Sequence, residues 1–163
     1  MSNIFMFREG VKGESSDKFH KDWMDIESIE WRIRRKITSR TSTRGDRESS
    51  NPEYSELLLF KRMDIATPKI FIESCYGGGK TVIIECTKTG SGNGGDVYLQ
   101  YRLENAVISH YNVSVKAKRG KRPLEAIKIS FKRLEQRYIP YGEDNIAKSP
   151  IAVGYDAACN MVA

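Results

Sequence analysis

The sequence lacks the features that mark several large classes of protein. Its 163 residues contain no apolar run that approaches the roughly 20 residues needed to cross a bilayer, so we expect no membrane insertion. The first ten residues, MSNIFMFREG, have no basic start, no long apolar stretch and no small-residue cleavage site. They do not form a secretory signal, and we expect that a protein with this sequence would leave the cell by another route.

Cysteine and histidine are scarce as well. Cys75, Cys86 and Cys159 are widely spaced, odd in number and without a CxxC motif, which argues against a disulfide scaffold and suits a reducing cytosol. Only His20 and His110 could join them as metal ligands. We therefore expect no zinc site, no other metal and no cofactor.

Two motifs point to chemistry, but their context does not support it. Gly77–Thr81 reads GGGKT and resembles half of a phosphate-binding loop, yet Ser74 stands where the full pattern needs glycine. His20 lies near Asp17 in a polar loop, where hydrogen bonds that order the loop are a better interpretation than base catalysis. No motif for a nucleophile is present. We therefore predict that the protein is not an enzyme and assign no catalytic residue.

Positive charge is in excess, with a net charge of +6, and it is concentrated in two segments. Residues 32–44 hold six basic residues and no acid, and residues 116–122 add five more. Such segments are solvated faces, or they bind nucleic acid, membrane surfaces or acidic proteins. A basic β-barrel that binds nucleic acid is thus an alternative function, although aromatic residues on strands more often belong to a core than to a base-stacking platform.

Short apolar and alternating runs predict a mainly β chain. The expected strands are Ile4–Phe7, Leu57–Phe60, Thr81–Cys86, two strands over 96–115 with a break near Glu104 and Asn105, and a strand over 126–138. The last of these slips phase by one residue near Lys132, which predicts a β-bulge. Thr67 as N-cap, Pro68 in the first turn and Gly77 in a left-handed C-terminal position predict one short helix between them.

The segment after the second tryptophan reads differently. Ile29, Trp31, Ile33 and Ile37 alternate with basic residues, which predicts a half-buried strand whose exposed face carries Arg32, Arg34 and Lys36. The following residues, 38–56, are polar and long for a loop without structure. We expect them to form a projecting loop or hairpin that contacts another subunit. The resulting fold class is mainly β: a single domain over 1–163, with a β-barrel formed by two antiparallel sheets, one short α-helix and a long extended loop.

Several short motifs in a fixed order resemble the Hcp proteins of bacterial type VI secretion. They are VKGES at Val11–Ser15, GDRESSNPEYSEL from Gly45, KRMDIATPKIF from Lys61, EAIKISFKRLEQRY from Glu125, and GYD at Gly154–Asp156. The resemblance spans nearly the whole chain. It departs from the family pattern at RKITSRTSTR, where many members have a stretch rich in glycine and serine.

The resemblance implies a homohexameric ring with a central pore, stacked into a tube that a contractile sheath expels. The implied partners are further copies of the chain, the sheath proteins, the trimeric spike protein VgrG and effectors in the pore; nucleic acid is not expected. The protein would stay in the bacterial cytoplasm before firing and then be secreted without a signal peptide. Candidate assembly residues are Thr38, Arg40, Thr41, Arg44, Asp46, Arg47, Glu48 and Tyr54. Candidates for the pore or a basic face are Arg32, Arg34, Lys36, Lys118 and Arg119.

Overall fold

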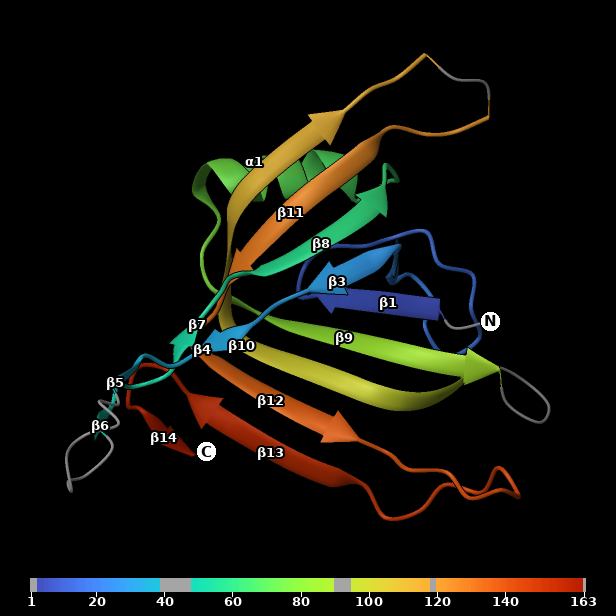
Figure 1. Cartoon of the computed structure of the whole chain (residues 1–163). Coiled ribbons are helices and arrows are strands. Elements are labelled where there is room, and N and C mark those ends of the chain that lie inside the picture. Colours follow the sequence, from blue (N-terminus) through green and yellow to red (C-terminus); the bar gives the residue numbers. More distant parts are fainter. Residues whose placement is uncertain (1–2, 39–47, 90–94, 118–119, 163) are drawn as a thin grey trace.

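The computed structural model describes residues 3–38, 48–89, 95–117 and 120–162. In these residues the chain forms strands joined by turns and one α-helix, α1 (Thr67–Tyr76) (Figure 1). The strands are β1 (Asn3–Arg8), β2 (Met24–Ile26), β3 (Ser28–Glu30), β4 (Ile33–Arg34), β5 (Ile37–Thr38), β6 (Glu48–Ser49), β7 (Glu53–Tyr54), β8 (Leu57–Arg62), β9 (Lys80–Thr89), β10 (Gly95–Ser114), β11 (Leu124–Ser130), β12 (Arg133–Tyr138), β13 (Ile151–Asp156) and β14 (Met161–Val162).

One long strand, β10, belongs to two antiparallel sheets. Its first part pairs with β9 and β12, and the first sheet runs β2-β1-β9-β10-β12-β13-β14. Its second part pairs with β11, and the second sheet runs β10-β11-β8-β3. The sequence predicts two strands here; the structure has one strand that changes sheet. The change comes near the expected break, where the register with β9 shifts between Leu103 and Ala106 and Asn105 takes a positive φ of 51°.

The two sheets are also joined on a second side, which gives a barrel-like arrangement around the core. The chain passes from β2 in the first sheet to β3 in the second through Glu27, whose backbone N–H donates to the carbonyl of Phe60 in β8 at 2.8 Å. Fully buried side chains from both sheets meet between them, among them Met24, Leu59, Ile84 and Ile129. The predicted mainly β fold of two antiparallel sheets with one helix is confirmed.

The expected β-bulge near Lys132 is wrong in detail. Strand β11 ends at Ser130 and β12 starts at Arg133, and the two pair with different parts of β10. The phase slip in the sequence therefore marks the point where the chain leaves the second sheet and enters the first. A bulge and a change of sheet leave the same trace in a sequence, because each shifts the alternation by one residue.

The helix lies where the sequence predicts it, but both of its ends differ from expectation. Thr67 is already helical, the N-cap is Ala66, and the first turn is held by Asp64, whose carboxylate accepts from the N–H of Ala66 at 2.9 Å. Gly77 is extended, with φ −69° and ψ 144°, rather than left-handed. Its need for glycine is steric, since a Cβ there would lie 2.5 Å from the carbonyl oxygen of Glu73.

Candidate assembly surfaces

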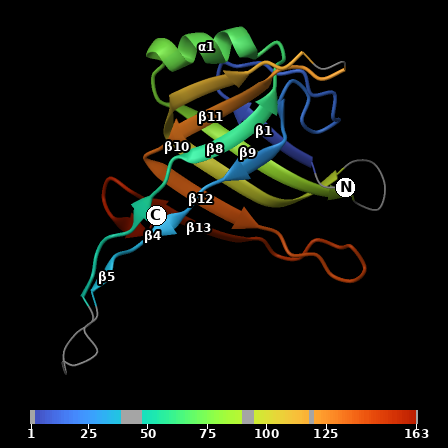
Figure 2. The same cartoon turned by 45° about the horizontal axis from the view of Figure 1, so that its top comes forward.

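The polar segment that follows Trp31 is an ordered hairpin in its described part. Two short two-stranded sheets form it, with Ile33 opposite Tyr54 and Ile37 opposite Ser49. Figures 1 and 2 show β4 to β7 extending away from the body of the protein in both views. Of the segment 38–56 that the sequence predicts to project, the structure describes Thr38 and residues 48–56, and residues 48–55 form a projecting hairpin with residues 32–38. Its contact with another subunit stays a prediction.

Two serine hydroxyls complete the hydrogen bonding of this hairpin. The hydroxyl of Ser55 accepts from the N–H of Arg32 at 2.8 Å, and that of Ser50 accepts from the N–H of Lys36 at 2.8 Å. The backbone N–H groups of the same serines donate in return to the carbonyls of Arg32 and Lys36, each at 3.0 Å. The exposed backbone therefore finds partners within the hairpin, and the hairpin can keep its shape before it meets another molecule.

The side chains of the hairpin are more exposed than the alternating pattern predicts. Ile33 is 51% exposed and Ile37 is 61% exposed, so the prediction of a half-buried strand over these residues is wrong. The pattern places them on one face, but no described part of the body covers that face. Arg32, Arg34 and Lys36 are exposed as expected.

Tyr54 connects the base of the hairpin to the body. Its ring lies 5.4 Å from that of Tyr155 on β13 and 6.2 Å from that of Phe131, measured between ring centroids. Burial, followed by the neighbouring Tyr155, raises the pKa of the Tyr54 hydroxyl above its ordinary value. Among the predicted interface residues whose side chains the structure describes, Tyr54 packs against the body. It stays protonated at neutral pH, so this contact carries no charge.

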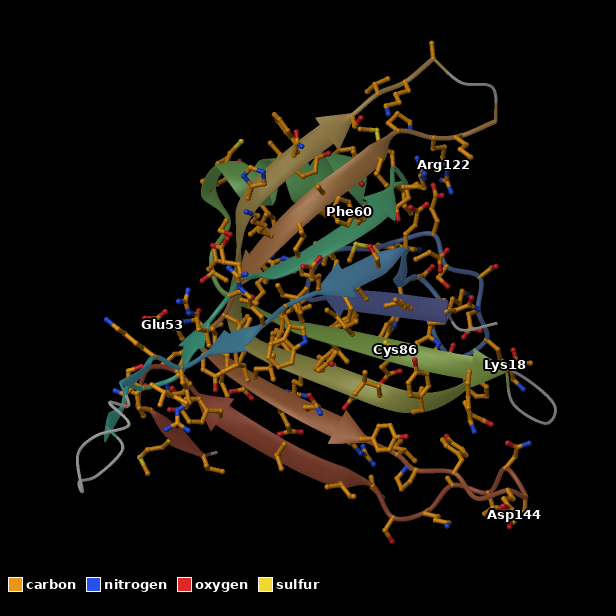
Figure 3. The ribbon with its side chains drawn as sticks, viewed as in Figure 1. Lys18, Glu53, Phe60, Cys86, Arg122 and Asp144 are labelled. Carbon is orange, nitrogen blue, oxygen red and sulfur yellow. The ribbon has the colours of Figure 1, made fainter. Side chains whose placement is uncertain are left out.

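The remaining predicted residues fall into two groups. Thr38 and Glu48 face each other across the β5–β6 ladder. Arg40, Thr41, Arg44, Asp46, Arg47, Lys118 and Arg119 lie outside the described residues. The described parts of the two basic segments lie apart: Figure 3 shows Glu53 on the hairpin at one end of the molecule and Arg122, in the second basic segment, at the opposite end.

A second exposed apolar surface adjoins the base of the hairpin, and the sequence analysis missed it. Tyr155, which contacts Tyr54, lies opposite Val162 in the outermost pair of the first sheet. The exposed apolar side chains of this pair are Ile151, Val153, Met161 and Val162, each at least 60% exposed. The alternation of Ile151, Val153 and Tyr155 with Ala152 and Gly154 is the signal that could have revealed this strand.

The two motifs that suggest chemistry have structural roles here. His20 is 2% exposed, and its ring nitrogens lie 2.7 Å from carboxylate oxygens of Asp17 and Glu85, so its hydrogen bonds order the loop as predicted. The glycines of GGGKT follow α1 and precede β9, the reverse of a phosphate-binding loop. The described residues contain no cluster of ligands suited to a metal ion. Among the described residues, no helix is long and apolar enough to span a membrane.

Comparisons with known proteins give a family and a fold. The family model described as "Type VI secretion system effector, Hcp" matches residues 5–138. A solved structure titled "Structure of a type six secretion system protein" superposes with a TM-score of 0.91 at 23% identity, over 100% of both chains. The crystal structure of Hcp1 from Salmonella typhimurium superposes with a TM-score of 0.79 at 22% sequence identity, over 99% of both chains. The structure of a type VI secretion system effector from Yersinia pestis superposes with a TM-score of 0.73 at 19% sequence identity, over 94% of this chain and 99% of that chain. A search of curated proteins finds no match.

Proposed function

We propose that this chain, which belongs to the Hcp family of type VI secretion system proteins, is the structural subunit of a secretion tube. Six copies would form a ring, and rings would stack into an inner tube that a contractile sheath expels behind the spike protein VgrG. Effectors would travel in the pore. The subunit would reside in the bacterial cytoplasm before firing and leave the cell with the tube, without a signal peptide.

The observation that best supports this proposal is the hairpin of residues 32–38 and 48–55. Its backbone is satisfied internally, yet its two isoleucines are more than half exposed. A preformed element of this kind costs little ordering entropy when it docks, and its apolar side chains gain burial only against a neighbour. Strand β14 leaves a further open edge, which ring closure would cover.

Two measurements test the assembly. Native mass spectrometry of the purified chain is expected to show six subunits, and negative-stain electron microscopy is expected to show rings. A heterologous interface closes into such a ring only if its rotation permits, so a defined number of subunits is the informative result. A mass of one subunit at micromolar concentration, without rings, would contradict the proposal.

The role of the hairpin in stacking has its own test. Deletion of Thr41–Ser49 is expected to abolish stacking of rings into tubes, because it removes β6 and with it the β5–β6 pairing of the hairpin. Tubes of normal length from this variant would exclude a stacking role. If Arg32, Arg34 and Lys36 line a contact or the pore, assembly or cargo binding should also weaken with salt, since exposed charges are screened over about 8–10 Å at physiological ionic strength.

The same experiments separate this proposal from a monomeric nucleic-acid binder. Such a protein would show an affinity for nucleic acid that falls steeply with salt, because each phosphate contact releases counterions. The tube subunit would show a ring mass and no such affinity.

A further inference from the structure

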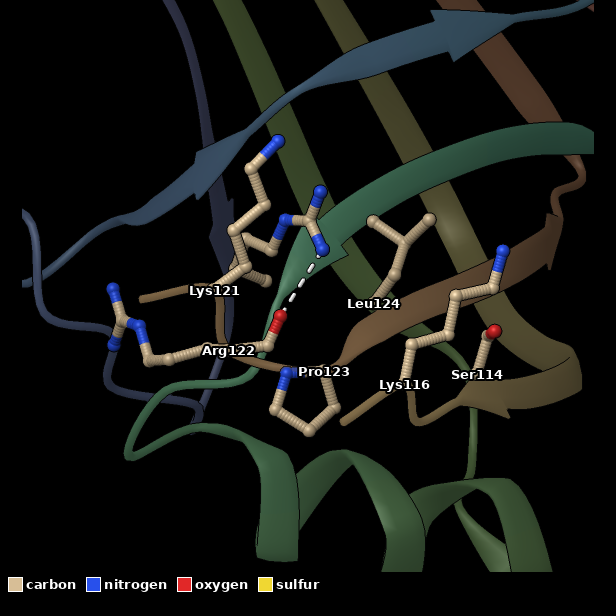
Figure 4. Close-up of a pocket in the computed structure, with 7 residues that line it drawn as sticks. Ser114, Lys116, Lys121, Arg122, Pro123 and Leu124 are labelled. Atoms are coloured by element: carbon tan, nitrogen blue, oxygen red, sulfur yellow. Dashed lines mark hydrogen bonds between the residues drawn. The ribbon is translucent and has the colours of Figure 1, made fainter. Parts of the chain in front are cut away.

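A small pocket opens at the end of the second sheet, on the far side of the molecule from the hairpin. It has a volume of about 210 Å³. Its lining residues are Arg62, Ser114, Lys116, Lys121, Arg122, Pro123 and Leu124. Figure 4 shows Leu124 between Lys116 and Ser114 on one side and Lys121 and Arg122 on the other. Four of the lining side chains are cationic and none is acidic.

Three neighbouring strands fix the base of the pocket. Arg62 at the end of β8 lies opposite Leu124 at the start of β11, and Leu124 lies opposite Ser114 at the end of β10. Residues opposite each other in a sheet project from the same face, so these three side chains share one side. The N–H of Met63 donates to the carbonyl of Pro123 at 3.0 Å and holds the incoming loop against β8. The base is therefore part of the rigid sheet.

The two arginines are held in place by two carboxylates outside the lining and by one backbone carbonyl within it. Nε of Arg62 donates to Oε1 of Glu27 at 2.7 Å, and its Nη1 donates to the carbonyl of Arg122 at 3.0 Å (Figure 4). Nη1 of Arg122 donates to Oε2 of Glu14 at 2.8 Å. Exposed ion pairs of this kind contribute little to stability. Their effect here is to fix both guanidinium groups, with that of Arg122 turned toward Glu14 and away from Leu124 and Ser114 (Figure 4).

The two lysines of the lining differ from the arginines in their charge partners. Lys116 and Lys121 are exposed, and neither forms an ion pair with any residue in the described part of the chain. They enter from the two ends of the loop that joins β10 to β11, so they reach the pocket from different directions. The charges of the two arginines are compensated by Glu27 and Glu14, whereas the two lysines bring like charges to one small space, and an anion placed between them relieves their repulsion.

We propose that this pocket binds the phosphate groups of a small phosphorylated ligand. A phosphate carries oxygens in several directions and can accept together from the lysine ammonium groups, from the N–H groups of Arg62 that Glu27 and the Arg122 carbonyl leave free, and from the Ser114 hydroxyl. A carboxylate offers only two oxygens in one plane. Pockets for whole drug-sized molecules measure roughly 300–1,000 Å³, so this smaller one suits a phosphate or pyrophosphate group whose carrier extends into solvent.

The test is calorimetric titration of inorganic pyrophosphate into the full chain, in a phosphate-free buffer of constant ionic strength. The pocket variant is Lys116→Gln/Lys121→Gln. Its control is Lys69→Gln/Lys148→Gln, which removes two exposed lysines outside the pocket and so lowers the net charge equally. We expect the wild type to bind, the pocket variant to lose roughly 10- to 100-fold in affinity, and the control to change less than about 2-fold. Thermal unfolding of both variants should match the wild type, because all four lysines are exposed.

Three results would overturn the proposal. The first is absence of binding by the wild type. The second is an equal loss in the pocket variant and the control, which would mean attraction to net charge alone. The third comes from titrating a single-stranded oligonucleotide of random sequence: if it binds through Lys116 and Lys121 while pyrophosphate does not, the site serves a nucleic-acid backbone. Ring formation enters none of these readouts, so they do not depend on the tube proposal.

Discussion

Arg8 and Glu73 form an ion pair inside the protein. Nε of Arg8 lies 2.5 Å from Oε2 of Glu73, and the side chains are 1% and 4% exposed. The other nitrogens of Arg8 donate to the carbonyls of Ala106 at 3.1 Å and Gly78 at 3.4 Å, while Lys80 donates to the second oxygen of Glu73. The pair therefore ties α1 to β1, to β10 and to the turn that follows the helix.

Replacing Glu73 with glutamine is expected to destabilise the protein strongly. The change leaves the buried Arg8 guanidinium without its counter-charge, and breaking a buried pair in this way costs about 3–5 kcal/mol. Chemical denaturation measures the free energy of unfolding. The control is Lys12→Gln, which breaks an ion pair with Asp22 whose side chains are 67% and 45% exposed; we expect a change within about 0–1 kcal/mol. Equal effects from the two variants would contradict a structural role for the buried pair.

The same carboxylate predicts a pH dependence. Burial alone would raise the pKa of Glu73, but hydrogen bonds from Lys80 and Arg8 outweigh it and hold the pKa below its ordinary value of 4.5. A group with a lowered folded-state pKa stabilises the fold above its unfolded-state pKa and loses that contribution as the pH falls toward the folded value. The stability difference between wild type and Glu73→Gln should therefore shrink below about pH 4.5. A difference that stays constant down to about pH 3 would argue against this linkage.

Gly77 and Gly78 offer a matched pair of alanine substitutions. A Cβ at Gly77 would meet the backbone of Glu73, whose carbonyl also accepts the closing hydrogen bond of the helix from the N–H of Gly77 at 2.8 Å. A Cβ at Gly78 would have nothing within 4 Å. We expect Gly77→Ala to lower the unfolding free energy by about 1–3 kcal/mol and Gly78→Ala to change it by about 0.5 kcal/mol or less. Similar melting temperatures for the two variants would show that the helix end adjusts without strain.

The elements that the sequence predicts well are those whose pattern follows directly from burial. Leu57 and Leu59 on β8, and Ile127 and Ile129 on β11, alternate with more exposed residues and are fully buried. A period of two is the direct consequence of burying one face of a strand, so the sequence itself carries this information. The helix is bounded in the same local way, by Pro68 and Gly77.

Long-range pairing is what the sequence does not show. Lys61 and Glu125 read as surface charges, yet both are completely buried and their charged atoms lie 2.6 Å apart. They meet because the register of β8 and β11 places them directly opposite each other. Ile33 and Ile37 give the opposite error. Their alternation predicts an apolar face that is buried, but the pattern is the same whether this chain or another copy buries it.

Whether another copy of the chain covers Ile33 and Ile37 can be tested by placing a charge at one of them. Ile37→Asp is expected to leave the stability of the isolated subunit within about 0.5 kcal/mol of wild type, because the side chain is 61% exposed there. If the hairpin docks on a neighbour, the same carboxylate would be buried without a partner, and the six-subunit species should disappear from native mass spectra. The matched control is Ile146→Asp, at a position that is 65% exposed and lies outside the hairpin. Rings of normal mass from Ile37→Asp, or equal loss of rings in both variants, would show that the exposed isoleucines of the hairpin do not form the contact.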